Sequence, residues 1–540
     1  MKTTADVVII GGGIIAAMEA YYAYLEAKQK NTQVRVTIYE KNKSITETTA
    51  FNITPSLTPD EILSVVPRGP VLAEKLGILF SEPGGIRIND VATVNDSAVA
   101  EKFISQVQVY SKDETGHQAR TQKLLELGKM SMNLWQGIYD NADAELKKIL
   151  EESSFNPCRE PRSEHSVLHD GYRIDLIYDV PAAINKANSM KNDYESLGYT
   201  HCKILSPAEV EELDPFLTDF CESHSERSVS GERQWKTDTV ALYRPGGCLE
   251  TEVFLPKFYA YLHRVMGQYV NDAGELKDCF QMQFDRNVKE VIYDVNNRST
   301  INGLRFFNNM VKQNKHAYND SSYVFCPGES VGTLTHLGFN EPAYAGFAGA
   351  SLKLNIPLSA DALKKYAGFN HCMEVHQEGV VLAWQARAKN DRIFIGVSGT
   401  KAFYSDKKPH KDQVFAKNRN LLQLNMINDV LPEFISLALG RNTKGEKLTE
   451  VDLGMLEEMK IANRWVGTRA VAFDGFPTLG RLQNSTGKVS NARCTTHLGS
   501  AGVSFSPAAV MISRRELEEK SQEDTLAQAI LTYGSPGRRM

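Results

Sequence analysis

The sequence predicts an α/β (α+β) fold of two lobes with a helical insertion. The first lobe opens with a β-branched run (Asp6–Ile10), a glycine turn (11–13), a helix-like run (17–30) and a second β-branched run (Val34–Tyr39). This order is typical of a βαβ unit, whose crossover we expect to be right-handed. Residues 98–152 carry apolar side chains at helical spacing, which indicates the helical insertion. Strand-like and helix-like segments then alternate from residue 171, which indicates a mixed-sheet lobe.

The later elements are predicted from the same two patterns. Strands are expected at 171–178, 202–205, 288–292, 323–328, 350–356, 379–385 and 392–397. One helix is expected to follow the strand at 171–178 and to end at about Ser196. Two more are expected at 330–337 and 421–439. Because the strand at 323–328 runs directly into a glycine turn and a helix, the first lobe is expected to resume there.

Composition excludes several classes of protein. The formal charge of −5, from 61 basic and 66 acidic residues, gives no positive field that would favour nucleic acid as a partner. The eight cysteines form no C-x-x-C pair, so we expect no metal site and no disulfide framework. There is no signal-peptide pattern and no run approaching about 18 apolar residues, so no integral membrane segment is expected. A cytoplasmic location follows, with peripheral membrane attachment left open.

The glycine turn fits a dinucleotide-binding fingerprint, Gly11-x-Gly13-x-x-Ala16. The first glycine would make the turn, the second would admit the pyrophosphate, and the small third residue would let helix pack on strand. Glu40 ends the second strand, where its carboxylate can accept hydrogen bonds from ribose hydroxyls and would repel the 2′-phosphate of NADP. The candidate dinucleotide contacts in this lobe are Gly11, Gly13, Ile14, Ile15, Ala16, Glu40 and Lys41. The fold is therefore expected to be Rossmann-like.

Segments at the far end of the chain resemble the FAD-dependent D-amino acid oxidase superfamily. The run from Trp465-Val466-Gly467-Thr468-Arg469 to Asp474-Gly475-Phe476-Pro477 and Gly480 resembles the family's W-x-G-x-R-x-x-T-x-D-G-x-P-x-x-G segment, and 497–507 is similar to its G-H-G-S-x-G-x-T-x-A-P turn. Residues 48–52 look like the S/T-x-A-x-N turn of the D-amino acid dehydrogenase branch, and 241–247 resemble the family's G-A-x-x-x-P-x-x-G. The pattern is closest to D-amino acid dehydrogenases and glycine oxidase-like enzymes. It departs from the family at His497, where glycine is usual, at Leu498, where histidine is frequent, and at Ser504, where threonine is common.

The resemblance implies FAD as the cofactor, which we assume to be bound non-covalently. The additional contacts that it implies are Thr48, Thr49, Asn52, Val288, Gly328, Gly480, Gly499, Ser500, Ala501, Gly502, Val503 and Ser504. It also implies an FAD-binding domain assembled from residues 1–95, 246–345 and 456–540, a helical insertion at 96–160, and an inserted mixed-sheet substrate domain at 161–245 and 346–455. In the family, the C-terminal turn and the following helix place backbone N–H groups at the pyrimidine end of the flavin.

Three residues are candidates for catalysis. Arg469 occupies the motif position that, in relatives, grips a substrate carboxylate, and a planar guanidinium suits that task because it binds both oxygens. The alternative for Arg469 is a structural salt bridge. His497 could accept a proton from a substrate ammonium, or could instead be fixed within its turn. Tyr243 could face the substrate from the second lobe, or could only pack there.

The expected function is oxidation of a small amine or amino acid, a CH–NH or CH–NH2 donor. Hydride would pass to flavin N5 and leave an imine, and oxygen or a quinone would reoxidise the flavin. A flavin-dependent dehydrogenase of 2-hydroxy acids is an alternative, because the glycine turn with its long helix also resembles the opening of malate:quinone oxidoreductases. A flavin-binding scaffold without turnover is the other alternative.

Overall fold

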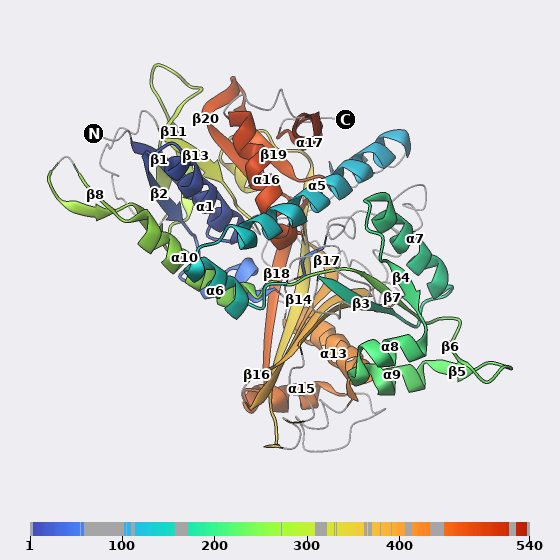
Figure 1. Ribbon diagram of the computed structural model, residues 1–540. Coiled ribbons are helices and arrows are strands. Elements are labelled where there is room, and N and C mark those ends of the chain that lie inside the picture. The colour runs from blue at the N-terminus through green and yellow to red at the C-terminus, as the bar shows by residue number, and fades with distance from the viewer. Residues whose placement is uncertain are drawn as a thin grey trace.

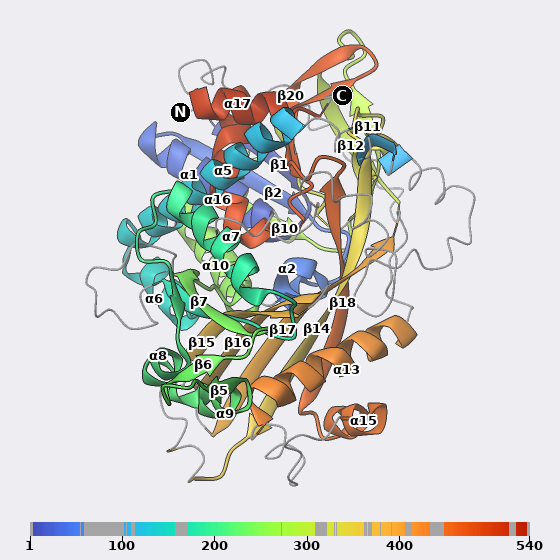
Figure 2. The same cartoon turned by 90° about the vertical axis from the view of Figure 1, so that its right-hand side faces the viewer.

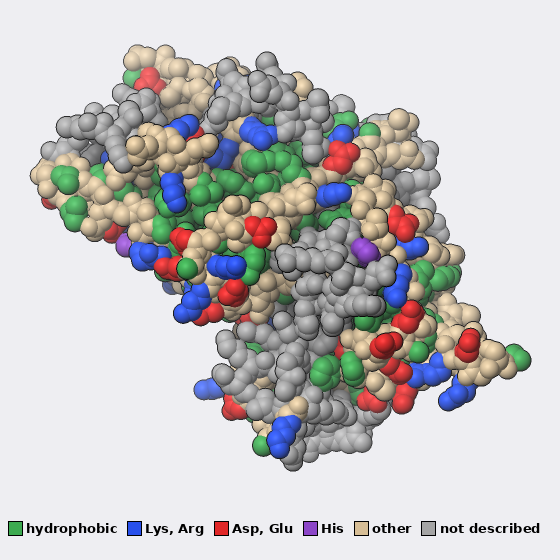
Figure 3. All heavy atoms as spheres, viewed as in Figure 1, with side chains coloured by type: hydrophobic (Ala, Val, Ile, Leu, Met, Phe, Trp, Pro, Cys, Tyr) green, Lys and Arg blue, Asp and Glu red, His purple; other side chains and the backbone are tan. Residues whose placement is uncertain are grey.

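A computed structural model describes most of the chain. The described residues are 4–53, 56–58, 102–103, 105–107, 109, 114–156, 171–271, 273–307, 321–328, 330, 332–360, 364, 370–377, 380–389, 391–404, 413–432, 448–499, 501–517 and 525–536. They form two lobes, each built on one large sheet, and both labelled ends of the chain lie on the upper lobe (Figure 1). Among them, no helix combines the length and the apolar character that crossing a membrane requires. Basic and acidic side chains are interspersed over the described part of the face in Figure 3.

The upper lobe contains a six-stranded sheet in the order β10-β2-β1-β13-β20-β19. Strands β10 to β20 pair in parallel, and β19 is antiparallel to β20. Their bounds are β1 Thr4–Ile10, β2 Gln33–Tyr39, β10 Phe280–Gln283, β13 Ser322–Phe325, β19 Thr478–Asn484 and β20 Gly487–Thr496. Since α1 (Ile14–Gln29) connects β1 to β2, the predicted βαβ unit is confirmed.

Helices from distant parts of the chain cover one face of this sheet. They share a core in which Ala16, Ala17 and Ala20 of α1 are fully buried, which lets the helices approach closely. These helices are α5 Glu114–Asp140, α6 Ala144–Glu152, α10 Thr251–Met266, α16 Gly502–Leu517 and α17 Thr525–Gly534. The other face packs against β11 Val288–Tyr293, β12 Ile301–Phe306 and α11 Thr333–His336. Figure 2 shows α1, α5 and α16 beside one another above the lower sheet.

The lower lobe contains an eight-stranded sheet in the order β18-β14-β17-β16-β15-β3-β7-β4. Its strands are β3 Tyr172–Ile177, β4 Lys203–Leu205, β7 Val240–Pro245, β14 Tyr344–Pro357, β15 Asn370–Gln377, β16 Val380–Lys389, β17 Arg392–Tyr404 and β18 Ala462–Ala472. The pairs are antiparallel except for β15 with β3, so the predicted mixed sheet is confirmed. Helices α8 Pro207–Leu213, α9 Thr218–Ser223, α13 Gln413–Val430 and α15 Glu450–Glu458 pack on one face, and α7 Ala183–Ser196 lies beside β7.

The shorter elements are turns and hairpins around these two sheets. They are η1 Ile45–Glu47, α2 Thr49–Asn52, η3 Pro215–Leu217, β5 Ser225–Arg227, β6 Arg233–Trp235, β8 Gln268–Val270 and β9 Leu276–Asp278. Two of the sequence predictions differ from the structure. The expected helix at 421–439 begins earlier, at Gln413, and ends at Val430, and residues 433–439 lie outside the described part of the chain. Strand β18 belongs to the lower sheet, although the domain division expected from the resemblance counts residues 456–540 with the upper lobe.

Candidate functional site

A cavity lies at the carboxyl ends of the parallel strands of the upper sheet. Gly11 follows β1, Glu40 follows β2, Cys326 follows β13 and His497 follows β20, and all four residues line the cavity. It encloses about 870 Å³, part of it open to solvent. Ligands of open α/β sheets bind in this position, because connections that leave in opposite directions open a crevice there. The glycine turns near the two ends of the chain therefore meet around one space.

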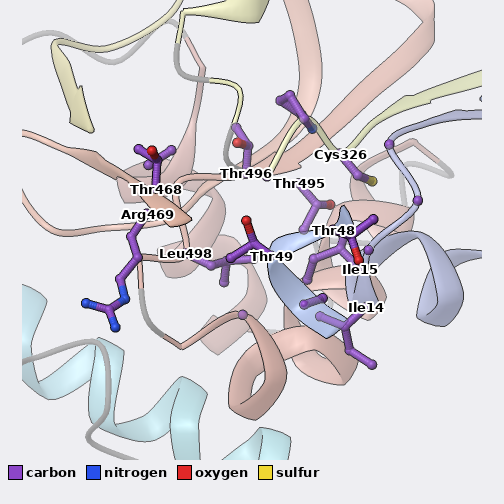
Figure 4. A pocket seen from close by; sticks show the side chains of 18 of the residues that line it. Ile14, Ile15, Thr48, Thr49, Cys326, Thr468, Arg469, Thr495, Thr496 and Leu498 are labelled. Atoms are coloured by element: carbon purple, nitrogen blue, oxygen red, sulfur yellow. The ribbon is translucent and has the colours of Figure 1, made fainter. Parts of the chain in front are cut away.

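The cavity collects many of the residues predicted from the sequence. Of these, it is lined by Gly11, Gly13, Ile14, Ile15, Glu40, Lys41, Thr48, Thr49, Gly328, Arg469, His497, Gly499, Gly502 and Val503. Other residues complete the lining without having been predicted as contacts, namely Gly12, Asn42, Ala50, Ile53, Cys326, Pro327, Thr468, Ala470, Thr495, Thr496 and Leu498. Figure 4 shows Arg469 at one side of the cavity and Ile15 and Cys326 at the other, with Thr49 and Leu498 between them in this view.

The glycine turn leaves its backbone open to a ligand. Gly11 has φ +109°, and a Cβ there would lie 2.1 Å from the carbonyl oxygen of Cys326, so no side chain fits. At Gly12 a Cβ would lie 2.7 Å from Met282 Cε. Gly13 caps α1 without a side-chain cap, and the first N–H groups of a helix have no acceptor within the helix. The turn and helix can therefore take a pyrophosphate, whose charge suits the positive end of the helix.

Glu40 holds the turn through both carboxylate oxygens. Oε2 accepts a hydrogen bond from the N–H of Gly12 at 2.6 Å, and Oε1 accepts one from the N–H of Asn42 at 2.8 Å. Each carboxylate oxygen has a second lone pair, so ribose hydroxyls could still donate to it. Lys41 donates to the hydroxyl of Ser330, which ties this loop to the turn after β13.

Tyr259 is a part of the site that the sequence did not indicate. Its hydroxyl lies 3.0 Å from the carbonyl oxygens of both Gly12 and Gly13. This contact fixes the backbone of the glycine turn from the side of α10. Burial, with the negative charge of Glu40 close by, raises the pKa of Tyr259 well above its usual value, so the hydroxyl stays a donor. A tyrosine on the buried side of α10 has no local pattern that distinguishes it from a core residue.

The turn at 48–52 is held by its own side chains. Thr48 donates to the carbonyl of Ile45 at 2.8 Å and accepts from the N–H of Phe51. Asn52 donates to the carbonyl oxygens of Thr46 and Thr48 at 2.8 and 2.9 Å. Asn52 does not line the cavity, so in this structure it shapes the turn, whereas Thr48 and Thr49 face the space.

The C-terminal turn joins the two lobes beside Arg469. The N–H of Gly499 donates to the carbonyl of Ala470 at 3.1 Å, and Leu498 forms an antiparallel bridge with Val471. Because the N–H groups of Gly499 and Ala501 are bonded within the protein, they shape the turn, and the first turn of α16 at Gly502 and Val503 faces the cavity. Ser504 is directed elsewhere, since its hydroxyl donates to the carbonyl of Ser56 at 2.9 Å.

Arg469 stands on β18 with its guanidinium over a glycine of the neighbouring strand. A Cβ on Gly349 would lie 2.8 Å from Cζ and from both terminal nitrogens of Arg469. Gly349 therefore leaves the space in which the guanidinium lies. Strand β18 brings this cation to the same cavity as the glycine turns.

Tyr243 is a correction to the sequence prediction. It belongs to the core between the lower sheet and α8, α9 and α13, and its ring stacks on Tyr172 at 5.2 Å. The adjacent Arg244 lies on the opposite face, because side chains alternate along a strand. Tyr243 is thus directed away from the cavity.

Other predicted contacts also lie away from the cavity wall. Val288 packs in a core cluster with Val8 and Ile10. Ala16 is buried in α1, and Gly480 bends β19 with φ +101°. Ser500 lies outside the described residues.

His497 is fixed on both ring nitrogens. Nδ1 lies 2.7 Å from the hydroxyl of Thr478, and Nε2 lies 3.0 Å from Oε1 of Glu341. In this arrangement neither nitrogen is open to a substrate, so the predicted role as proton acceptor is not supported by the geometry. The alternative, a histidine fixed in its turn, describes the structure better, although its partners are side chains.

A buried cluster of charges lies on the face of the lower sheet opposite Tyr243. The guanidiniums of Arg173 and Arg244 each contact both Asp175 and Glu374. Burial alone would raise the pKa of Glu374, but the two guanidiniums hold it well below its usual range. With His376, the two acids could present three ligand atoms to a metal ion. Their charge is already balanced by two arginines, which argues for a structural ion-pair cluster.

Comparisons with known proteins identify the fold. No family model and no curated protein matches the sequence. Among solved structures, the chain is similar to glycine oxidase from Bacillus cereus, with a TM-score of 0.51 and 14% identity over 99% of both chains. It is also similar to NikD, described as an unusual amino acid oxidase essential for nikkomycin biosynthesis, with a TM-score of 0.52 and 12% identity over 99% of this chain and 98% of that one. A third similar structure is fructosyl peptide oxidase from E. terrenum, with a TM-score of 0.51 and 13% identity over 97% of this chain and 91% of that one. The chain thus has the α/β fold of these oxidases, as the sequence predicted.

Proposed function

We propose that this protein is an FAD-dependent oxidoreductase that oxidises a small amine or amino acid. The observation that carries the proposal is the meeting of the two glycine turns at one cavity, with the guanidinium of Arg469 on its wall. The resemblance of both turns to the D-amino acid oxidase superfamily supports FAD as the occupant. The structural neighbours support the substrate class, since they are named as oxidases of glycine, amino acids and fructosyl peptides.

The residues present fit FAD. The glycine turn, which admits no Cβ at Gly11, suits the pyrophosphate, and Glu40 suits the ribose. The N-terminus of α16 at Gly502 suits the pyrimidine end of the flavin, where its positive end would stabilise negative charge. When bound, FAD would supply an acceptor for a hydride from the substrate carbon, leaving an imine that water hydrolyses.

Arg469 would bind and orient the substrate. Its guanidinium can bind both oxygens of a carboxylate and so fix the neighbouring carbon toward the cofactor. The bond between the N–H of Gly499 and the carbonyl of Ala470 sets the distance between this arginine and the cofactor turn. The apolar side chain of Leu498, which lies next to Arg469 on the cavity wall, would help exclude water from the reacting atoms.

The proposal extends to the acceptor and the location. The names of the structural neighbours favour oxygen as the acceptor, with a quinone as the alternative. The substrate would bind between the lobes, with residues 161–245 and 346–455 as the proposed substrate domain. We keep the cytoplasm as the proposed location, with or without peripheral attachment to a membrane.

The test is anaerobic reduction of the bound flavin by separate pools of glycine, N-methylglycine, D-amino acids, L-amino acids and malate. We expect an amine or amino acid pool to bleach the flavin. Bleaching by malate alone would favour the 2-hydroxy acid alternative, and no bleaching by any pool would favour the scaffold.

A pair of variants on one strand tests the role of Arg469. Arg469→Lys should retain the flavin and raise the apparent Kd for the reducing amino acid about 10- to 100-fold, because one of two charge-assisted hydrogen bonds is lost. Arg464→Lys is the control, since Arg464 lies on the same strand as Arg469 and pairs with Glu457 of α15. Equal behaviour of the two variants would remove Arg469 from the substrate site.

A further inference from the structure

The turn between β20 and α16 begins with a residue in an uncommon conformation. His497 has φ +58°, in the left-handed region that glycine adopts freely and that costs energy for a residue with a Cβ. Such a residue persists only where its surroundings hold it. His497 lines the cavity, so whatever holds it also shapes the wall of the proposed cofactor site.

Three side chains hold His497. Glu341 contacts Nε2 of the imidazole and Thr478 contacts Nδ1. The ring of Tyr344 stacks on the imidazole, with 5.9 Å between the ring centroids and an angle of 11° between the planes. The side chains of His497 and Glu341 are each only 1% exposed. A carboxylate can only accept hydrogen bonds, so Nε2 must carry the proton that is shared with Glu341.

Glu341 also binds the helix that follows a second lining segment of the cavity. Its Oε2 accepts hydrogen bonds from the N–H of Thr335 at 2.9 Å and from the hydroxyl of Thr335 at 2.7 Å. Thr335 lies on α11, which follows the turn after β13 where Cys326, Pro327 and Gly328 line the cavity. One carboxylate therefore uses one oxygen for His497, which lines the cavity, and the other for α11, which follows the lining residues Cys326, Pro327 and Gly328.

We propose that Glu341 is a positioning residue of the cofactor site, which acts through His497. It fixes the start of the C-terminal turn relative to the turn after β13, and so sets where the N-terminus of α16 meets the ligand. This inference rests on the proposed function, because the ligand that it positions is FAD. It assigns to Glu341 and His497 a role in cofactor affinity and in flavin potential, and no role in proton transfer.

Replacement of Glu341 by glutamine tests whether both carboxylate oxygens are needed as hydrogen-bond acceptors. The carboxamide has one oxygen and two N–H donors, whereas both oxygens of Glu341 accept from donors. In Glu341→Gln, the charge-assisted link to His497 or a link to Thr335 is therefore lost, since the amide N–H2 can meet Nε2 of His497 only if the ring proton moves to Nδ1, beside Thr478. We expect the Kd for FAD, measured by quenching of flavin fluorescence in apoprotein titrations, to rise about tenfold for the one hydrogen bond lost. We also expect the midpoint potential of the bound flavin to shift, because the helix N-terminus moves relative to it.

A double-mutant cycle separates this role from general destabilisation. His497→Gly removes the side chain that Glu341 binds and allows the left-handed backbone. If Glu341 acts through His497, Glu341→Gln should raise the Kd for FAD much less in the His497→Gly background than in the wild type. Equal effects in the two backgrounds would overturn the inference. Glu209→Gln is the control, because Glu209 caps α8 in the other lobe and should leave the Kd for FAD unchanged.

The same titrations distinguish failure of the inference from failure of the proposed function. If the wild type takes up no FAD, both the inference and the proposed function are overturned. If the wild type binds FAD but the effects of the two substitutions on the Kd simply add, only the inference is overturned. Thermal unfolding of each variant checks the fold. If Glu341→Gln proves unfolded, Thr335→Ala takes its place in the cycle, because it removes one donor to Glu341 and preserves every charge. Its effect on FAD affinity should likewise shrink when His497 is glycine, and an unchanged effect would contradict the proposal.

Discussion

Gly349→Ala should displace the guanidinium of Arg469, the proposed substrate arginine, without replacing any charged or cavity-lining residue. The added Cβ would lie 2.8 Å from the guanidinium carbon of Arg469, whereas non-bonded carbon atoms prefer about 3.5–4.0 Å. The guanidinium must therefore retreat by at least about 0.7 Å, the difference between these two distances. Because the end of a long side chain can move, the fold should survive.

The expected loss is in turnover. A displacement of about 1 Å in a group that orients the substrate can cost on the order of 100-fold in rate. For Gly349→Ala we therefore expect the rate constant of anaerobic flavin reduction by the best amino acid to fall roughly 10- to 100-fold. The flavin content and the melting temperature should change little.

The assay is stopped-flow reduction of the flavin, with the Kd for the amino acid and the limiting rate measured separately. Gly303→Ala on β12 is the matched control, because a Cβ there meets only Ile292 at ordinary contact distances of 3.7 and 3.9 Å. If both alanine variants reduce at the wild-type rate, Arg469 does not orient the substrate, and the assignment of this arginine fails.

Two other substitutions probe the cofactor turn and the buried charges. Gly11→Ala should abolish FAD uptake, because its Cβ would lie 2.1 Å from the Cys326 carbonyl, and retained uptake in equilibrium dialysis would refute the role of the turn. The lowered pKa of Glu374 means that its contribution to stability is complete above the usual carboxyl range and is lost progressively as pH falls from that range toward the lowered pKa of the folded state. Glu374→Gln should therefore destabilise the protein near neutral pH, by about 3 kcal/mol or more for a broken buried pair, and flatten the fall of melting temperature between about pH 5 and 3. Parallel melting curves for wild type and variant in that range would contradict this account of the pair.

The sequence predicted the parts of the site whose chemistry requires a particular residue. A tight turn with a positive φ that packs on the backbone of the neighbouring strand admits no Cβ, so Gly11 is recognisable in the sequence, and the acid at the end of the second strand is placed by the βαβ unit itself. Arg469 was found because a motif carried it. These features are local, and local features can be read along the chain.

Features that depend on contacts between distant segments were missed. Tyr259 and Glu341 reach the site from segments that carry no motif, and an ordinary tyrosine or glutamate gives no sign of its partner. Tyr243 was misassigned for a related reason. Adjacent residues of a strand face opposite sides, and only the packing of the finished sheet shows that Tyr243 faces α8, α9 and α13 whereas Arg244 faces Tyr194 of α7.

The most direct measurement is the amount of FAD that the purified protein holds. The chain should be isolated yellow, or become yellow when reconstituted with FAD, and release one FAD per chain on denaturation. A folded protein that stays colourless in the presence of excess FAD would contradict the proposal that the two glycine turns enclose this cofactor.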